Sequence, residues 1–279
     1  MREIKLQAVT EAVKKAVVEV NYHLDNSLVG LIQKAKKEEK GTLARSILQD
    51  ILDNQTIARE GNLPLCQDTG MVVVFVEMGH DVRVSGDLDA AINQGVREGY
   101  NEGYLRKSVV SHPFQRVNTM DNTPAVIHYK IKSGDGFKLK IATKGAGSEN
   151  MSLVKMLTPA HGVDGVRNLI LDTVKQAGGK ACPPIILGIG LGGNLEKSAF
   201  LAKEALLREL DDVNADPYLA ELENRWLEDV NKLDIGPMGI GGATTCLAVK
   251  INTYPMHIAS LPVAINIQCH SARHTEVSL

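Results

Sequence analysis

A short polar loop that runs directly into a buried strand limits the possible folds and functions of this chain more than any other feature of the sequence. Residues 61–79 read GNLPLCQDTGMVVVFVEMG. The turn residues at 61–64 end a helical region, and the unbroken β-branched run at 71–76 predicts a buried strand. A thiol, an amide, a carboxylate and a hydroxyl therefore stand together at residues 66–69, at the mouth of a rigid strand, where proteins often carry catalytic groups. The same loop would also suit a small core cysteine followed by a plain polar turn.

The composition and charge of the chain exclude several classes of protein. The chain has 279 residues and a net charge of −2, so it suits one large domain or two ordinary ones. Neither nucleic acid nor an anionic membrane is expected as its main partner. Residues 1–5 lead into an amphipathic helix and not into the apolar core of a signal peptide. Because no apolar run reaches the length of a transmembrane helix, we expect a cytoplasmic protein.

Hydrophobic periodicity predicts a helical N-terminal region followed by alternating strands and helices. An apolar stripe with helical spacing runs through residues 3–60. Further helices are predicted at 87–103, with Asp87 as the N-terminal cap, and at 163–177, 195–210 and 217–232. Strands are predicted at 71–76, 125–131, 137–142, 184–190, 245–251 and 259–267. The glycine-rich turn at 133–136 indicates a hairpin. The expected fold is α/β (α+β), a single domain over 1–279 in which a helical cap (1–60) packs on a mixed β-sheet core with a cleft.

The four cysteines are too few and too scattered for a disulfide framework, and no CxxC pair suggests a zinc ribbon. Cys66, Cys182 and Cys269 each lie at the end of a predicted strand beside turn residues, where their side chains can meet in a shared cleft. Cys246 lies inside the apolar run 245–251, which indicates a small buried side chain. A three-cysteine metal site follows as a hypothesis. Zinc would want a fourth protein ligand, whereas an iron–sulfur cubane on three thiolates leaves one iron open for substrate.

Other groups suit the binding of an anion or the transfer of a proton. Gly145 belongs to a loop whose backbone N–H groups can face a carboxylate, although a plain loop gives the same pattern. Arg106 can clamp a carboxylate or can simply be solvated. His257 suits proton transfer near neutral pH, or a structural role. The GxGxxG spacing at 188–193 lacks the acidic residue about 20 positions later that dinucleotide binding uses, so it favours close backbone packing.

Five motifs together resemble one family. They are LPLCQDTG at 63–70, LRKS at 105–108, KGAGSEN at 144–150, CPPIILGIGLGGN at 182–194 and HIASLPVAINIQCHSAR at 257–273. The chain is similar, over nearly its whole length, to the iron–sulfur class I fumarate hydratases and to the related L-tartrate dehydratases. It matches the α subunit of two-subunit members, which corresponds to the N-terminal domain of single-chain members.

The resemblance implies a 4Fe-4S cluster in the cleft and a role for each candidate residue. The implied cluster ligands are Cys66, Cys182 and Cys269. The groups implied to hold a small dicarboxylate substrate are Gln67, Asp68, Arg106 and the Gly145 backbone. The resemblance also implies that Asp68 and His257 position the substrate and transfer protons. The fourth iron, open to substrate, would act as a Lewis acid.

The implied activity is that of a hydro-lyase of the tricarboxylic acid cycle, the reversible hydration of fumarate to L-malate. In this family a catalytic threonine and further cationic clamps belong to a C-terminal domain, to which nothing in this chain corresponds. A separate β subunit is therefore expected to complete the site, in an assembly of α2β2 type. Two alternatives stay open: an L-tartrate dehydratase α subunit, which forms oxaloacetate, and a non-catalytic metal-binding protein on the same fold.

Overall fold

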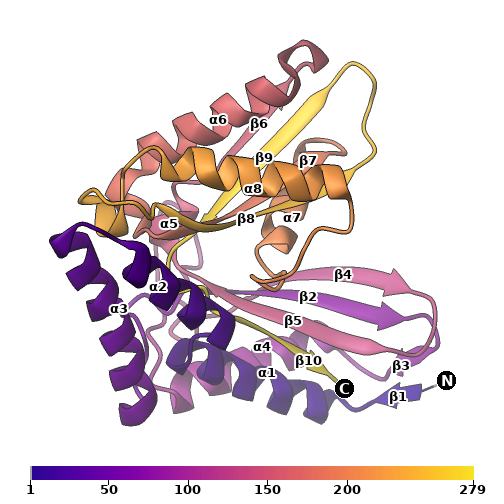
Figure 1. Cartoon of the computed structure of the whole chain (residues 1–279). Helices are drawn as coiled ribbons and strands as arrows, with labels where there is room; N and C mark the ends of the chain where they lie inside the picture. Colours follow the sequence, from indigo (N-terminus) through magenta and orange to yellow (C-terminus); the bar gives the residue numbers. More distant parts are fainter. Residues whose placement is uncertain (1) are drawn as a thin grey trace. The chain divides into compact units, whose positions relative to one another are not determined.

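The fold is mixed α/β, which confirms the fold class predicted from the sequence. A computed structural model describes residues 2–279, and Figure 1 labels its helices and strands. Contacts within the chain divide it into two compact units. Unit 1 contains residues 2–24, 55–146 and 273–279, and unit 2 contains residues 25–54 and 147–272. Two helices contribute residues to both units, α3 (Thr42–Gly61) and the short α5 (Ala146–Glu149).

Unit 1 consists of a four-stranded sheet, a two-stranded sheet and two packed helices. Its elements are β1 (Arg2–Ile4), α1 (Leu6–Tyr22), β2 (Met71–Gly79), β3 (Val82–Val84), α4 (Leu88–Glu102), β4 (Val126–Lys132), β5 (Phe137–Lys144) and β10 (His274–Ser278). The larger sheet has the order β10-β5-β2-β4, and β1 pairs in parallel with β3. Residues 72–76 of β2 are apolar and buried on both faces of the sheet. They confirm the strand predicted at 71–76.

The helices α1 and α4 pack closely because two glycines of α4 face α1. A Cβ atom at Gly95 would lie 2.6 Å from the Thr10 carbonyl oxygen, and one at Gly99 would lie 2.4 Å from a methyl group of Val17. The Asp87 side chain caps α4, as predicted, by accepting a hydrogen bond of 2.9 Å from a backbone N–H of its first turn. Apolar side chains of both helices then cover the buried face of the larger sheet.

The hairpin predicted through residues 133–136 is wrong. The strands β4 and β5 do not pair with each other, because β2 lies between them, parallel to β4 and antiparallel to β5. The 133–136 turn passes over the end of β2, where the Gly79 N–H donates to the Gly136 carbonyl at 2.8 Å. A local turn signal cannot show that a strand from another part of the sequence lies between β4 and β5.

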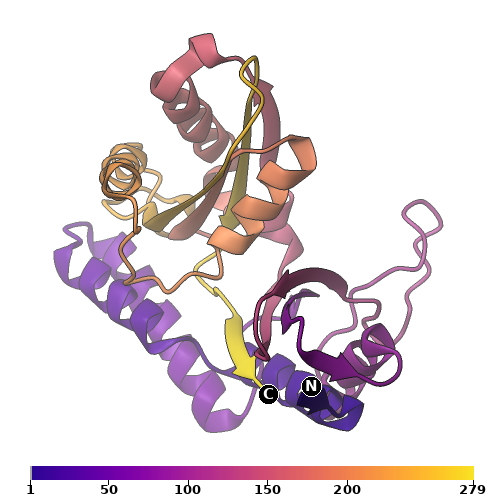
Figure 2. The same cartoon turned by 90° about the vertical axis from the view of Figure 1, so that its right-hand side faces the viewer.

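Unit 2 is a second four-stranded sheet with helices on both faces. Its elements are α2 (Asn26–Glu38), β6 (Leu153–Leu157), α6 (Gly162–Ala177), β7 (Ile185–Gly192), α7 (Leu195–Ala205), α8 (Pro217–Asn231), β8 (Cys246–Tyr254), β9 (Leu261–Gln268) and three 3₁₀ turns (Pro159–His161, Gly178–Ala181 and Pro237–Gly239). The sheet has the order β6-β9-β7-β8. Apolar side chains of α6 and α8 pack on one face, and α7 covers the other (Figure 2).

The glycines of β7 serve close packing, which is what the sequence favoured over nucleotide binding. A Cβ atom at Gly188 would lie 2.2 Å from the Ala202 carbonyl oxygen, and one at Gly190 would lie 2.0 Å from the Ser198 carbonyl oxygen. Both carbonyls belong to α7. Only glycine therefore lets the α7 backbone lie directly on the strand.

Several element ends differ from the prediction, and short strands such as β1, β6 and β10 are absent from it. The first helix begins at Leu6 and not at residue 3, because residues 2–4 pair as β1 with β3. The helix α7 ends at Ala205, before the predicted end at 210. The strands β1, β6 and β10 have only three to five residues each. Strands this short carry too little periodicity to be recognised in the sequence.

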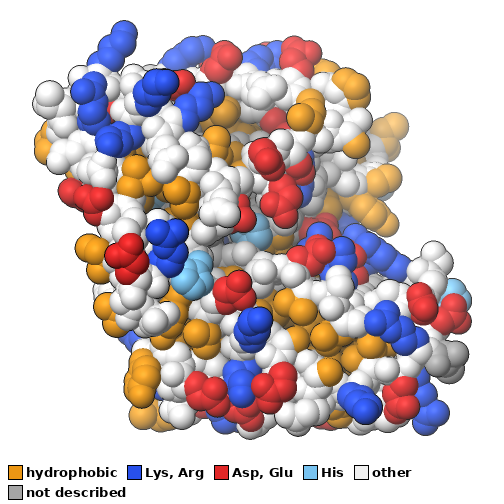
Figure 3. Space-filling model, turned by 60° about the horizontal axis from the view of Figure 1, so that its bottom comes forward, with side chains coloured by type: hydrophobic (Ala, Val, Ile, Leu, Met, Phe, Trp, Pro, Cys, Tyr) orange, Lys and Arg blue, Asp and Glu red, His pale blue; other side chains and the backbone are white. Residues whose placement is uncertain are grey.

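The charged side chains on the surface are mixed in sign. On the face that Figure 3 shows, acidic and basic groups occur side by side. In unit 1, for example, Lys14 Nζ lies 3.1 Å from Glu11, 3.8 Å from Glu98 and 3.6 Å from Glu102. Among residues 2–279, no helix combines the length and the apolar character needed to span a bilayer.

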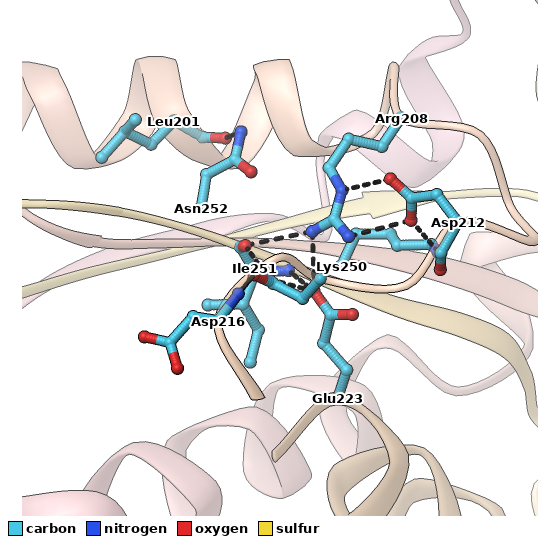
Figure 4. A network of polar contacts seen from close by, with 9 residues as sticks. Leu201, Arg208, Asp212, Asp216, Glu223, Lys250, Ile251 and Asn252 are labelled. Atoms are coloured by element: carbon cyan, nitrogen blue, oxygen red, sulfur yellow. Dashed lines mark hydrogen bonds and ion pairs between the residues drawn. The ribbon is translucent and has the colours of Figure 1, made fainter. Parts of the chain in front are cut away.

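An ion network that includes the buried side chains of Glu223 and Lys250 fixes the segment after α7 to β8 and α8 (Figure 4). Arg208 donates to both carboxylate oxygens of Asp212, at 2.8 and 2.9 Å, and its Nη1 donates to Glu223 at 2.7 Å. Lys250 of β8 is only 4% exposed and pairs with the same Asp212 carboxylate. Burial alone would raise the pKa of Asp212, but hydrogen bonds from Arg208 and Lys250 outweigh it and hold that pKa below its usual value.

We expect Asp212→Asn to lower the free energy of unfolding by about 1 kcal/mol at neutral pH, because Lys250 then loses its carboxylate partner while Arg208 keeps Glu223. Since the folded pKa of Asp212 lies below its unfolded value, this contribution is complete above about pH 4 and is lost as the pH falls through the folded pKa. Urea unfolding followed by fluorescence measures it, because the single tryptophan, Trp226, is buried in unit 2. A wild-type/variant difference that stays constant down to about pH 2 would contradict this account.

Candidate active site

The side chain of Asp68 is held by the ends of two neighbouring strands in unit 1. Met71, the first residue of β2, pairs with Lys144, the last residue of β5, so the loop before β2 lies beside residues 145–146. The Ala146 N–H donates to Asp68 Oδ2 at 2.8 Å, and the Gly70 N–H donates to Oδ1 at 3.1 Å. Backbone donors of the chain itself therefore fix both carboxylate oxygens.

A buried tyrosine fixes the main chain that follows Asp68. Tyr100 of α4 is fully buried, and its hydroxyl lies 2.6 Å from the Thr69 carbonyl and 3.0 Å from the Gly70 carbonyl. Burial raises the pKa of this phenol, so it stays a hydrogen-bond donor. Gly70 has φ +76°, and a Cβ atom there would lie 2.7 Å from the Lys144 main chain. Only glycine suits this close approach of the loop to β5.

Arg106 and Gln67 lie together on the exposed side of the same loop. Arg106 Nη1 donates to Gln67 Oε1 at 3.2 Å, and the Arg106 carbonyl accepts a hydrogen bond of 2.8 Å from Thr69 Oγ1. Unit 1 therefore brings together four of the residues selected from the sequence, which are Gln67, Asp68, Arg106 and Gly145. A guanidinium, an amide, a carboxylate and backbone N–H groups in one place suit the binding of a small carboxylate.

The segments that carry Cys182 and Cys269 meet at one end of the sheet of unit 2. The strand β7 begins shortly after Cys182, and β9 ends immediately before Cys269. The two strands are antiparallel neighbours, with Ile186 opposite Gln268. His270 joins the two segments, because its N–H and its Nδ1 lie 3.3 and 2.9 Å from the Cys182 carbonyl oxygen. Both thiols are half-buried.

Cys246 differs from the other cysteines, as the sequence indicates. It is 1% exposed in β8, and its thiol donates to the Ala248 carbonyl at 3.2 Å. Burial raises its pKa to about 12. Cys66, in contrast, is half-buried in the loop before β2. It belongs to unit 1 while the Cys182–Cys269 pair belongs to unit 2, and within the described range 2–279 no three His, Cys, Asp or Glu side chains gather to hold a metal.

His257 lies at the other end of the sheet of unit 2. It belongs to the loop between β8 and β9, next to the C-terminal end of β7, where the Gly193 N–H donates to the Tyr254 carbonyl at 3.3 Å. Cys182 and Cys269 lie at the N-terminal end of β7. This strand has eight residues, which at ~3.3 Å per residue span about 23 Å. Unit 2 therefore does not bring His257 together with its own cysteine pair.

The imidazole of His257 is exposed but oriented. Its Nδ1 accepts a hydrogen bond of 3.1 Å from the Ala259 N–H, so the neutral ring carries its proton on Nε2. The loop also exposes apolar side chains, above all Ile258, which is 89% exposed. The loop therefore presents an ordered histidine among apolar groups that unit 2 leaves uncovered.

Three residues that support the loop of Asp68 are absent from the candidates selected by sequence. They are Asn21, Tyr100 and Arg273, which come from α1, from α4 and from the residue before β10. Each is buried. Asn21 and Tyr100 give no sequence signal beyond lying on amphipathic helices. Arg273 gives one, because it ends the motif at 257–273 soon after Cys269.

Known proteins resemble this chain over nearly its whole length. A family model described as fumarate hydratase (Fumerase) matches residues 10–278. A chain of Methanocaldococcus jannaschii, provisionally named L(+)-tartrate dehydratase subunit alpha, is 39% identical over 272 residues and is covered to 95%, as is the present chain. The L(+)-tartrate dehydratase alpha subunits of Escherichia coli (strain K12) and Shigella boydii are each 30% identical over 276 residues, which cover 96% of this chain and 91% of theirs. The chain therefore belongs to the fumarate hydratase family.

Proposed function

We propose that this chain is the α subunit of a hydro-lyase that adds water to, or removes water from, a small dicarboxylate. The observation that carries the proposal is the group formed by Gln67, Asp68, Arg106 and Gly145 in unit 1, which offers a cation, an amide and backbone donors around one carboxylate. The family model and the tartrate dehydratase relatives support the same class of reaction.

Each of these residues has a chemical task in the proposed reaction. Arg106 binds one substrate carboxylate through its terminal nitrogens, and the Gln67 amide fixes the orientation of that carboxylate. The Gly145 backbone, which lies beside Asp68, helps to hold the substrate. Both carboxylate oxygens of Asp68 are held by N–H groups. The carboxylate therefore stays in a fixed position while it donates or accepts a proton.

The half-buried thiols fit the 4Fe-4S cluster of this proposal. Cys66, Cys182 and Cys269 would hold it, and the cluster when bound would supply a Lewis acid for the substrate hydroxyl. Metal ligation needs thiolates, and Cys269 Sγ already accepts an N–H from Gln268 at 3.7 Å. Cys246 does not fit, because burial raises its pKa. We propose that the two units form a single catalytic domain, in which Cys66 joins the other two ligands.

A separate β subunit completes the site in this proposal. The relatives carry the names of alpha subunits, which supports a second polypeptide with the remaining cationic and catalytic groups. We propose an α2β2-type assembly that works in the cytoplasm, with fumarate and L-malate of the tricarboxylic acid cycle as its substrate pair.

We infer that His257 serves the site of a second copy of this chain. The length of β7 separates it from the cysteine pair of its own unit, and a small dicarboxylate is much shorter than about 23 Å. The exposed Ile258 beside it suits contact with another chain. A proton-transfer role for His257 therefore requires a neighbouring copy.

We expect the anaerobically reconstituted complex with the β subunit to use L-malate and fumarate with kcat/KM at least about tenfold above that for L-tartrate. Tartrate is the second candidate, favoured by the names of the relatives. Its extra hydroxyl gives a sharp readout, because a site that hydrogen-bonds this hydroxyl rejects malate by about 10⁴-fold. The chain without its β subunit is the control, and we expect its rate to be at least about 10³-fold lower. A strong preference for tartrate would select the second candidate, and a loaded cluster without turnover would select a non-catalytic metal-binding protein.

A further inference from the structure

Arg273 is a buried cation in unit 1 with few hydrogen bonds of its own. It directly precedes β10 and is 3% exposed. Its Nη1 donates to Asn21 Oδ1 at 2.9 Å, and its carbonyl accepts from the Thr143 N–H at 3.0 Å. Its Nε has no hydrogen-bond partner within residues 2–279. Because a buried guanidinium is costly unless an anion is near, its surroundings should contain a carboxylate.

The Asp68 carboxylate lies near this guanidinium, on the same side of the Gly145 backbone. A methyl group placed on Gly145 would lie 3.1 Å from Asp68 Oδ2 and 3.4 Å from Arg273 Nη2. The two charged groups therefore approach the same backbone position, and both act electrostatically on the Tyr100 hydroxyl. Gly145 leaves room for both groups. Arg273 thus stands next to a carboxylate that backbone N–H groups already hold.

Asn21 ties this arginine to the segment that carries Cys66 and Asp68. It is fully buried in α1, and its side chain donates to the Val17 carbonyl at 2.8 Å while accepting from Arg273. Its main-chain carbonyl accepts a hydrogen bond of 2.8 Å from the Leu65 N–H, immediately before Cys66. One residue of α1 therefore joins the arginine to the start of the loop.

We propose that Arg273, held by Asn21, is a positioning residue for Asp68. It acts through the Asp68 carboxylate and the Gly145 backbone and does not touch substrate, so it is not a catalytic residue. The proposal rests on the proposed function in that Asp68 must act on a substrate. Arginine suits this role because its planar, permanently charged fork serves Asn21 and the carboxylate together.

The first experiment measures the order of the loop without any catalysis. In the isolated chain, Arg273→Gln should speed hydrogen exchange of the Gly70 and Ala146 amides at least about tenfold, because these are the donors to Asp68. The matched control is Arg208→Lys, a change of another mostly buried arginine, 16% exposed, in the unit 2 network. It should leave both amides unchanged. Unchanged exchange in folded Arg273→Gln would overturn the proposal.

The second experiment measures turnover in the complex with the β subunit. Arg273→Gln should lower kcat about 100-fold with KM changed less than about threefold, because a misplaced group costs rate while Arg106 still binds substrate. Arg273→Lys should recover part of the loss. In an Asp68→Asn background, Arg273→Gln should lower kcat less than about twofold further. Full independence of the two substitutions would overturn the positioning role, whereas an inactive wild-type complex with the expected exchange would refute only the proposed function.

Discussion

Cys269→Ser should remove the cluster and the activity together. After anaerobic reconstitution, the wild-type chain should contain about four iron and four acid-labile sulfide atoms, and the variant fewer than about one of each. Hydro-lyase activity of its complex with the β subunit should fall at least about 10³-fold. The reason is that a serine hydroxyl does not ionise at neutral pH and cannot replace a thiolate. Cys66→Ser and Cys182→Ser should behave in the same way.

Cys246→Ser is the matched control for these three substitutions. Its thiol is buried in β8 and its pKa is raised to about 12, so it should contribute nothing to the cluster. The variant should keep about four iron atoms and activity within about twofold of wild type. It should lose about 1–3 kcal/mol of stability, because a hydroxyl then replaces a small apolar group in the core. Loss of iron from folded Cys246→Ser, or full iron in Cys269→Ser, would refute the ligand assignment.

Two inactive variants should restore activity when they assemble together. His257→Asn and Cys269→Ser should each leave less than about 1% of wild-type activity. If His257 serves the site of a second copy, a mixed pair combines the intact cysteines of one chain with the intact histidine of the other. Statistical mixing makes half of the pairs mixed, with one intact site of two, so about a quarter of wild-type activity should return. Co-expression of the two variants with the β subunit, followed by an anaerobic assay, measures it.

The control for this mixing experiment combines two variants that each lack one of the cysteine ligands, which a single chain must supply together. Cys182→Ser mixed with Cys269→Ser should restore nothing, because the segments that carry the two cysteines meet at one end of one sheet. A His257→Asn/Cys269→Ser mixture that stays inactive would show that His257 does not act from a second copy. Full activity of His257→Asn alone would remove this histidine from the site.

The parts of the fold that were predicted correctly are those with strong local signals. The β-branched run before Gly79 is the centre of the larger sheet of unit 1, and Asp87 caps α4. The pairing of β4 and β5 was not predictable, because the insertion of β2 between them depends on contacts far apart in the sequence. The short edge strands β6 and β10 lack the periodicity that identifies a strand.

The candidate site also has parts that could be predicted from the sequence and parts that could not. The family resemblance implies that Gln67, Asp68 and Arg106 hold a carboxylate, and the structure brings these residues together in unit 1. The distance of His257 from its cysteine pair could not be predicted, since most of the segment between His257 and Cys269 forms the extended strand β9 and does not return to the same edge of the sheet. Arg273 belongs to the motif at 257–273, but only the fold shows that it is buried beside α1.

The division of the chain into units has a consequence for its synthesis. The ribosome produces the first residues of unit 1 at the start, but β10 and Arg273, which complete that unit, come after every residue of unit 2. Every residue of unit 2 is therefore synthesised before unit 1 is complete. The edge of β5 that pairs with β10 stays unpaired until β10 has been synthesised. The loop that carries Cys66 and Asp68 thus gains its last support only after Arg273 and β10 have been synthesised, which sets the earliest moment at which the proposed cluster could bind to a finished site.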